Sequence, residues 1–229
     1  MIYLTGDTHG SFERVEEFCE DAMTTREDVL VILGDVGINF FGVQHDRGMK
    51  ESLAELPITL FCIHGNHEMR PEGIAVYKQA KWRGGKVYWE REFPNLIFAK
   101  DGEIYNLAGR RCIAIGGAYS VDKMDRKRGR DWWPDEQPSD EIKARVEDAL
   151  IKAKWKVDAV FSHTCPYDYI PSDSFSVKRP PGTVDKSTEE WLGEIEARLH
   201  YQMWYCGHFH IDRVDGKVCF MYEEFRELW

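Results

Sequence analysis

The chain has 229 residues, a formal net charge of -10 at pH 7, 43% hydrophobic residues and 13% aromatic residues. This composition supplies enough apolar side chains for a filled core and excludes a wholly disordered chain. The acidic balance argues against the non-specific polyanion binding of a strongly basic domain, and no apolar run approaches the length of a membrane span. We therefore expect one globular domain, residues 1–229.

The cysteines and the start of the chain both favour a reducing compartment. No two cysteines form a C-x-x-C pair, so buried thiols are expected rather than a disulfide framework or a zinc knuckle. The chain opens directly on the predicted strand Met1 to Thr5, without the basic and apolar segments of a secretory signal. We expect a cytoplasmic protein. The six cysteines are Cys19, Cys62, Cys112, Cys165, Cys206 and Cys219.

The first part of the chain alternates between continuous apolar runs, which predict buried strands, and helical stripes of apolar residues. In chain order these are a strand from Ile2 to Leu4, a helix from Ser11 to Met23, a strand from Val29 to Leu33, a helix from Met49 to Leu56, and a strand from Ile58 to Ile63. This β-α-β-α-β order predicts a parallel or mixed sheet with helical crossovers.

The rest of the chain is richer in strands and contains two long loops. Strands are predicted at Lys86 to Glu90, Leu96 to Ala99, Glu103 to Asn106, Arg111 to Ile115, Val157 to Phe161, Gln202 to Cys206 and Val218 to Tyr222. Helices are predicted at Asp140 to Lys154, with Ser139 as N-cap, and from a capping box at Ser187 to Glu190 as far as Leu199. The loops Ser120 to Gln137 and Pro166 to Lys186 are candidates for the rim of a binding site, because long loops in compact domains often bind ligands.

Five clusters of polar residues follow predicted strands. They are Gly6-Asp7-Thr8-His9-Gly10, Gly34-Asp35, Gly65-Asn66-His67-Glu68, Ser162-His163 and Gly207-His208-Phe209-His210. One Gly-Asp or Ser-His pair alone is usually a turn, but ligand sites in open α/β sheets lie beyond the carboxyl ends of the strands. The mixture of carboxylate, amide and imidazole groups suits Mn, Fe, Co or Zn, whereas calcium favours oxygen and structural zinc favours thiolates. The clusters therefore predict a site for two divalent metals.

The order of these clusters resembles the pattern G-D-x-H, G-D, G-N-H-[DE], H and G-H-x-H of the calcineurin-like metallophosphoesterase superfamily. The resemblance implies a four-layer α/β/β/α sandwich of two mixed sheets flanked by helices. It also implies two groups of metal ligands bridged by Asp35, with Asp7, His9 and His210 on the first ion and Asn66, His163 and His208 on the second. His67 matches the catalytic histidine of the superfamily, which binds no metal.

The implied activity is hydrolysis of phosphate esters by direct attack of a hydroxide that bridges two ions of Mn, Fe, Zn, Co or Ni, with His67 as general acid. Ser/Thr phosphoprotein phosphatases of the superfamily carry G-D-x-x-D-R-G and R-G-N-H-E. Here the segment Gly34 to Phe40 lacks the second Asp and the Arg, and His64 precedes Gly65. These departures argue against a protein phosphatase and leave the partner that orients His67 unidentified.

The loop after Tyr119 is basic and aromatic, and two interpretations stay open. In one, Arg126, Arg128 and Arg130 bind the substrate phosphate and Tyr119 approaches the metals. In the other, the loop is solvated and part-neutralised by its aspartates, with Trp132 and Trp133 packed on the core.

The acidic chain favours a phosphomonoesterase slightly over a phosphodiesterase or nuclease of the same superfamily. The expected substrate is a small molecule, a nucleotide or a phosphopeptide, nucleic acid is not favoured, and no membrane partner is expected. A non-catalytic metal-binding scaffold is the alternative from another class, and it is disfavoured because all seven ligands and His67 are present.

Overall fold

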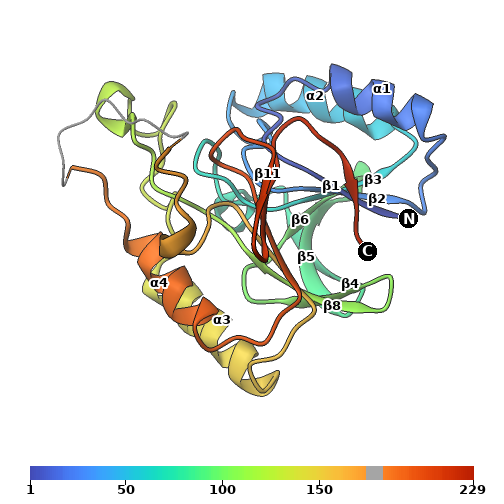
Figure 1. Ribbon diagram of the computed structural model, residues 1–229. Helices are drawn as coiled ribbons and strands as arrows, with labels where there is room; N and C mark the ends of the chain where they lie inside the picture. The colour runs from blue at the N-terminus through green and yellow to red at the C-terminus, as the bar shows by residue number, and fades with distance from the viewer. Residues whose placement is uncertain (174–182) are drawn as a thin grey trace.

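Two mixed β-sheets pack face to face, and a pair of helices covers each outer face, in the computed structural model of the chain (Figure 1). The structure describes residues 1–173 and 183–229, so the predicted loop Pro166 to Lys186 lies partly outside the described residues. The layers confirm the α/β/β/α sandwich. Within the described part of the chain, no helix is both long enough and apolar enough to cross a bilayer.

The first sheet has the strand order β13-β1-β2-β3-β6-β5-β4. Its members are β1 (Ile2–Thr5), β2 (Val29–Ile32), β3 (Thr59–Cys62), β4 (Lys78–Trp82), β5 (Gly85–Glu90), β6 (Phe93–Ala99) and β13 (Arg226–Glu227). Strands β1, β2, β3 and β6 are parallel, and β13 pairs antiparallel with β1 near the chain's N-terminus (Figure 1).

The second sheet has the order β11-β12-β10-β9-β8-β7. Its members are β7 (Ile104–Leu107), β8 (Arg110–Ile115), β9 (Ala159–Ser162), β10 (Met203–Cys206), β11 (Arg213–Asp215) and β12 (Val218–Phe220). The four central strands are parallel, and the edge strands β7 and β11 are antiparallel to their neighbours.

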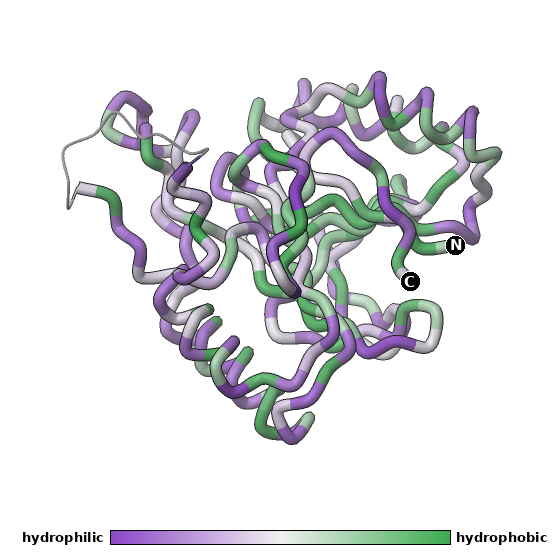
Figure 2. Tube along the Cα trace, in the orientation of Figure 1, coloured by the Kyte–Doolittle hydropathy of each residue, from purple (hydrophilic) through white to green (hydrophobic). Residues whose placement is uncertain are grey.

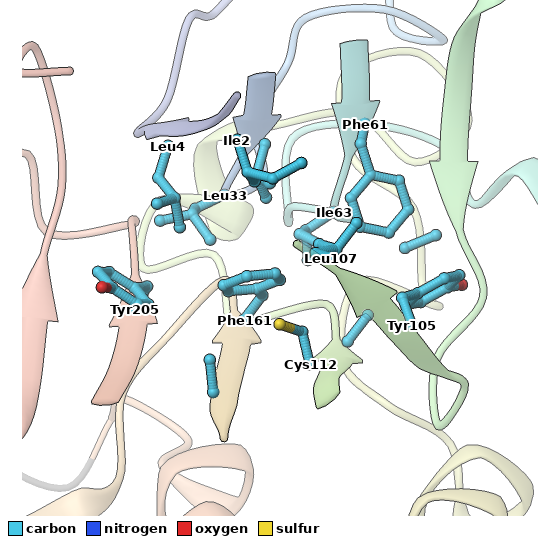
Figure 3. Packing of buried hydrophobic residues seen from close by; sticks show 14 of the residues in the cluster. Ile2, Leu4, Leu33, Phe61, Ile63, Tyr105, Leu107, Cys112, Phe161 and Tyr205 are labelled. Carbon is cyan, nitrogen blue, oxygen red and sulfur yellow. The ribbon is translucent and has the colours of Figure 1, made fainter. Parts of the chain in front are cut away.

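Apolar side chains from both sheets meet in the middle of the sandwich. Leu4, Phe61, Phe161 and Tyr205 point toward one another between the sheets, and each is almost completely buried (Figure 3). Burying one such side chain contributes about 1.5–3 kcal/mol. The central strands are accordingly hydrophobic along their length, whereas the outer helices mix hydrophilic and hydrophobic residues (Figure 2).

The helices form the two outer layers. Helices α1 (Glu13–Asp21) and α2 (Val43–Glu55) pack on the first sheet, and α3 (Asp140–Lys152) and α4 (Ser187–Glu196) pack on the second. The Ser139 side chain accepts a hydrogen bond from the Ile142 amide, which confirms this N-cap. Short 3₁₀ turns lie at Pro71–Gly73, Lys123–Asp125 and Tyr167–Tyr169. All six cysteines are buried and free, as predicted.

Some local predictions were wrong, and the strands β4, β11 and β13 were missed. Strand β4 was missed because its sequence Lys-Gln-Ala-Lys-Trp is mostly polar, and it pairs only with β5 at the sheet edge. Helix α2 begins at Val43 rather than Met49, because the Asp46 carboxylate accepts the amide hydrogens of Phe41 and Gly42 before the first turn. The capping box at Ser187 does not form, since Lys186 occupies the N-cap position.

Candidate metal centre

The five polar clusters lie at the carboxyl ends of parallel strands from both sheets. The loops after β1, β2 and β3 carry Asp7, Asp35 and Asn66, and those after β9 and β10 carry His163 and His208. Parallel neighbours end at the same edge of a sheet, and the two edges meet across the sandwich. Residues that are far apart in the sequence therefore converge on one point.

Asp7, His9 and His210 form the first group of potential ligands, with ligand atoms all within 4.8 Å of one another. The Nε2 atoms of His9 and His210 are 2.9 Å apart. The Asp7 carboxylate is oriented by the backbone amide of His208, which donates to both of its oxygens at 2.9 and 3.2 Å. The ring of His210 stacks on Tyr222 at 4.7 Å between centroids. This group contains the three residues that the resemblance assigned to the first ion.

Asp7, Asp35 and His163 form a second group with the same spacing, and all three side chains are buried. The Nε2 atom of His163 is 3.5 Å from Asp35 Oδ1 and 2.8 Å from Asn66 Oδ1. The Asn66 amide nitrogen donates to the Ser120 hydroxyl at 2.9 Å, so its oxygen faces the histidine. The ring of His208 lies beside this group, with its centroid 5.0 Å from that of His163.

The donor atoms of the second group suit a cation. The Nδ1 atom of His163 is 2.8 Å from the Leu33 carbonyl oxygen, which can only accept a hydrogen bond, so Nδ1 carries the proton in the neutral ring. The unprotonated Nε2 atom then faces the oxygens of Asn66 and Asp35, and three lone pairs point into one space. A divalent cation of the borderline class satisfies all three, so the residues fit the predicted metals.

Asp35 belongs to the second group and also lies near the first. Its Oδ1 atom faces His163, and its Oδ2 atom is 4.0 Å from His9 Nε2 in the first group. The Oδ1 atom also accepts the backbone amide of His67 at 2.9 Å, which fixes the plane of the carboxylate. Asp35 therefore presents one oxygen toward His163 and the other toward His9.

The loops that carry the ligands are tightly constrained. His9, Asp35, His208 and His210 all have positive φ, between 47° and 69°. Such conformations cost about 1–3 kcal/mol each and cluster at functional sites. Glycine is required at position 65, because a Cβ atom there would lie 2.0 Å from Asp35 Oδ1. Holding these side chains together therefore lowers the free energy of unfolding of the protein.

Glu68 holds the loops after β2 and β3 together, a role that the sequence interpretation missed. One oxygen accepts the amides of Val36 and Gly37 at 3.1 and 3.3 Å, and the other accepts the Gly65 amide at 2.9 Å. Burial, together with the negative charge of Asp35, raises the pKa of Glu68 to about 8. Its place at the end of the Gly65 to Glu68 cluster was the only signal in the sequence.

The buried charges of the centre shift one another's pKa values. Burial and the charge of Asp35 raise the pKa of Asp7 to about 7. For His163, burial lowers the pKa, but the charges of Asp35 and Asp7 outweigh it and raise the pKa to about 9. Burial likewise opposes ionisation of Asp35, but His163 holds the pKa of that carboxyl well below its usual range. The shifts of Asp7 and His163 thus favour their protonated forms, whereas that of Asp35 favours the ionised form.

Metal-free protein is expected to lose stability between about pH 6.5 and pH 9. Glu68 and His163 have folded-state pKa values of about 8 and 9, above their ordinary values of 4.5 and 6.5, so the folded chain binds more protons than the unfolded chain in this range. The free energy of unfolding then falls as the pH rises, on the order of a few kcal/mol in total. The lowered pKa values of His64 and His208, caused first by burial, act in the opposite sense only below about pH 6.5.

Urea unfolding in EDTA and in excess Mn²⁺ at several pH values measures this effect. Bound cations stabilise the folded state more as their ligands lose protons. The decline in the free energy of unfolding with rising pH should therefore be smaller with Mn²⁺. Equal declines under both conditions would contradict the metal assignment.

A pocket of about 390 Å³ opens beside the ligand groups, lined by His9, Gly37, Phe40, Phe41, His67, Asp122, Arg126 and His210. Arg126 is held by the Asp122 carboxylate at 2.7 Å and donates to the Asp131 carbonyl at 3.1 Å. Arg128 and Arg130 are exposed and do not line this pocket. Tyr119 is buried and donates from its hydroxyl to the Thr183 carbonyl at 3.3 Å. Of the four substrate residues proposed from the sequence, only Arg126 lines the pocket.

His67 also lines the pocket, and its Nε2 atom is 3.9 Å from Asp35 Oδ2. Its Nδ1 atom is buried, and no group in residues 1–173 and 183–229 forms a hydrogen bond with it. Burial lowers the pKa of His67, whereas the charges of Asp35 and Asp122 oppose that change. The neighbouring Arg126 adds to the effect of burial and lowers the pKa further.

Comparisons with known proteins agree with the fold. The family of calcineurin-like phosphoesterases matches residues 1–212. The chain is similar to the uncharacterized metallophosphoesterase YkuE of Bacillus subtilis (strain 168), with 28% identity over 108 residues, which cover 46% of this chain and 37% of that protein. The match thus spans little more than a third of that relative's length.

Two solved structures resemble this one. A crystal structure aligns with a TM-score of 0.51 at 13% identity, covering 96% of this chain and 88% of its own, which supports the fold alone. The protein of unknown function AQ665 from Aquifex aeolicus aligns at a TM-score of 0.36 and 15% identity, covering 74% of this chain and 81% of its own, and adds no argument. Because the family match extends over most of the sequence, the chain belongs to the calcineurin-like phosphoesterases.

Proposed function

We propose that this chain is a binuclear metal-dependent phosphoesterase that prefers phosphomonoesters. The observation that supports this most directly is the position of Asp35, whose Oδ1 atom faces His163 and whose Oδ2 atom faces His9 of the other ligand group. Asp7, His9 and His210 would hold one divalent ion, and Asn66, His163 and His208 would hold the other. Two ions held there would polarise the phosphoryl oxygens and lower the pKa of a bound water to near neutrality.

The side chains around the pocket provide the remaining functions. His67 is placed to give a proton to the leaving oxygen, since it lines the pocket beside the ligands without belonging to either group. Arg126 supplies a positive charge at the pocket wall and is positioned by Asp122. No side chain needs to form a covalent intermediate, so the protein's main contribution is to position the substrate.

The preference for monoesters rests on charge. Arg126 is the one Lys or Arg residue that lines the pocket in the described chain, and Asp122 lines it as well. A nucleic acid strand needs a run of basic side chains along its backbone, and the net charge of -10 works against it. A small ester, with its charge concentrated on one phosphoryl group, suits this pocket better.

Turnover of p-nitrophenyl phosphate, bis-p-nitrophenyl phosphate and nucleotides in Mn²⁺, Fe²⁺, Ni²⁺ and Zn²⁺ tests the proposal. We expect hydrolysis that EDTA abolishes and added metal restores, with the monoester cleaved faster relative to its uncatalysed rate. Predominant cleavage of the diester would overturn the monoester preference. Absence of turnover with every metal would favour a non-catalytic scaffold.

A further inference from the structure

Two adjacent phenylalanines form one wall of the pocket that contains His9, His67 and His210. Phe40 and Phe41 both line this pocket. The side chain of Phe41 is 50% exposed, and it also lines a second cavity of about 830 Å³ together with His45 and Met49. Phe41 therefore stands between the phosphoryl pocket and an outer groove, where the rest of an ester would lie.

The aromatic wall is fixed in place by several contacts. Phe40 meets Trp133 edge to face at 5.4 Å between centroids, and it meets Phe41 in the same way at 4.8 Å. Phe41 also packs on the His45 ring at 4.6 Å, and its backbone amide donates to the Asp46 carboxylate at 3.0 Å. An aromatic ring that already packs on neighbouring rings loses less conformational freedom when a ligand binds.

Single exposed apolar residues are common on protein surfaces and usually need no functional explanation. Met23, for example, is 83% exposed and lines neither of these cavities. Phe41 differs because it is fixed, belongs to an aromatic cluster and borders the pocket of the proposed metal centre. Its half-exposed ring offers an apolar, aromatic surface that a planar group could stack on.

We propose that this aromatic wall, formed by Phe40 and Phe41, selects phosphate esters whose leaving group carries a planar aromatic ring. The proposal rests on the phosphoesterase function and specifies its substrate class. The phosphoryl group lies against the metal ligands and Arg126, and the ring stacks on Phe41 toward the outer groove. A nucleoside and an arylmethyl alcohol both provide such a ring, and alanine substitution of a stacking aromatic typically weakens binding by roughly 5- to 150-fold.

Matched substrate pairs separate ring recognition from chemical reactivity. A nucleoside 5′-monophosphate and ribose 5-phosphate both release the 5′-hydroxyl of a ribose, but only the first carries a planar ring. Benzyl phosphate and cyclohexylmethyl phosphate both release a primary alcohol of similar reactivity, and again only the first carries a planar ring. In the Mn²⁺-loaded wild-type protein, we expect kcat/KM to favour the ring-bearing member of at least one pair by about 10-fold or more. Preference in the nucleotide pair alone would identify a nucleobase, and preference in both pairs would identify any planar ring.

The variant Phe41→Ala is expected to reduce this preference about 10-fold, whereas Phe41→Trp retains it. Met124→Ala is the matched control, because Met124 is 79% exposed and lines neither cavity, and it should leave the preference unchanged. Calorimetric binding of benzylphosphonate and cyclohexylmethylphosphonate, which are not hydrolysed, gives a second measure that does not depend on turnover.

The outcomes separate the two proposals. Equal kcat/KM within both pairs and equal phosphonate affinities would overturn ring selection while leaving the phosphoesterase function intact. A preference that survives in a folded Phe41→Ala variant would also overturn it. Failure to hydrolyse any ester would instead remove the proposed function.

Discussion

Replacing His67 by alanine is expected to lower kcat by about 10²–10⁴-fold, the usual contribution of a positioned general acid, while the protein keeps its metal ions. The expectation follows from the position of His67 in the pocket, outside both ligand groups. Only its backbone amide contacts Asp35 through a hydrogen bond, and that contact survives the substitution.

The leaving group provides the sharper test of the His67 role. A nitrophenolate leaves without much help from a proton, whereas an alkoxide does not, so the loss should be larger for an alkyl phosphate than for p-nitrophenyl phosphate. His200→Ala is the matched control, because His200 is exposed and belongs to no ligand group of the described chain. Equal losses of kcat for both esters, or a fall in metal content measured by mass spectrometry, would show that His67 does not act as a general acid outside the metal centre.

Replacing Asp35 by asparagine is expected to abolish measurable activity and to reduce the bound metal from two ions to one or none. The amide has the same shape as the carboxylate, and its oxygen can still accept the His67 amide. It lacks the negative charge that would hold two cations, and its NH₂ group would face a nitrogen of His9 or His163. Metal catalysis contributes several kcal/mol, so the loss in kcat/KM should be about 10³-fold or more.

Metal stoichiometry and turnover should be measured on the same Asp35→Asn sample. Asp148→Asn on α3 is the control, since it makes the same chemical change on an exposed helix position. A folded Asp35→Asn protein that still binds two ions would exclude Asp35 as the bridge. The His67 and Asp35 substitutions are complementary, because the first is expected to remove catalysis with the metals retained and the second to remove the metals.

The sequence predicted well those features that depend on short stretches of chain. Apolar runs such as Val29 to Ile32 form buried strands wherever a domain has a core, and the Ser139 cap needs only the three residues that follow it. The candidate ligands were recognisable for the same reason, since each occupies a short turn directly after a strand. Parallel strands then bring those turns to one edge, so the convergence followed from the strand order.

Other features depended on partners distant in the sequence. Glu68 joins the loops after β2 and β3, because it accepts hydrogen bonds from the amides of Val36 and Gly37 as well as from that of Gly65. Among the arginines of the Ser120 to Gln137 loop, only the folded chain distinguishes Arg126, held by Asp122 at the pocket, from Arg128 and Arg130, which point into solvent.

By itself, therefore, the sequence determined the order of most elements, the family and the chemical identity of the candidate ligands, all of which are local patterns repeated in a fixed order. The tertiary structure alone decided the spacing of the two ligand groups, the distances from Asp35 to His9 and His163, and the aromatic wall beside them. These depend on distances between side chains tens of residues apart, and such distances arise only when the two sheets pack and bury the core between them.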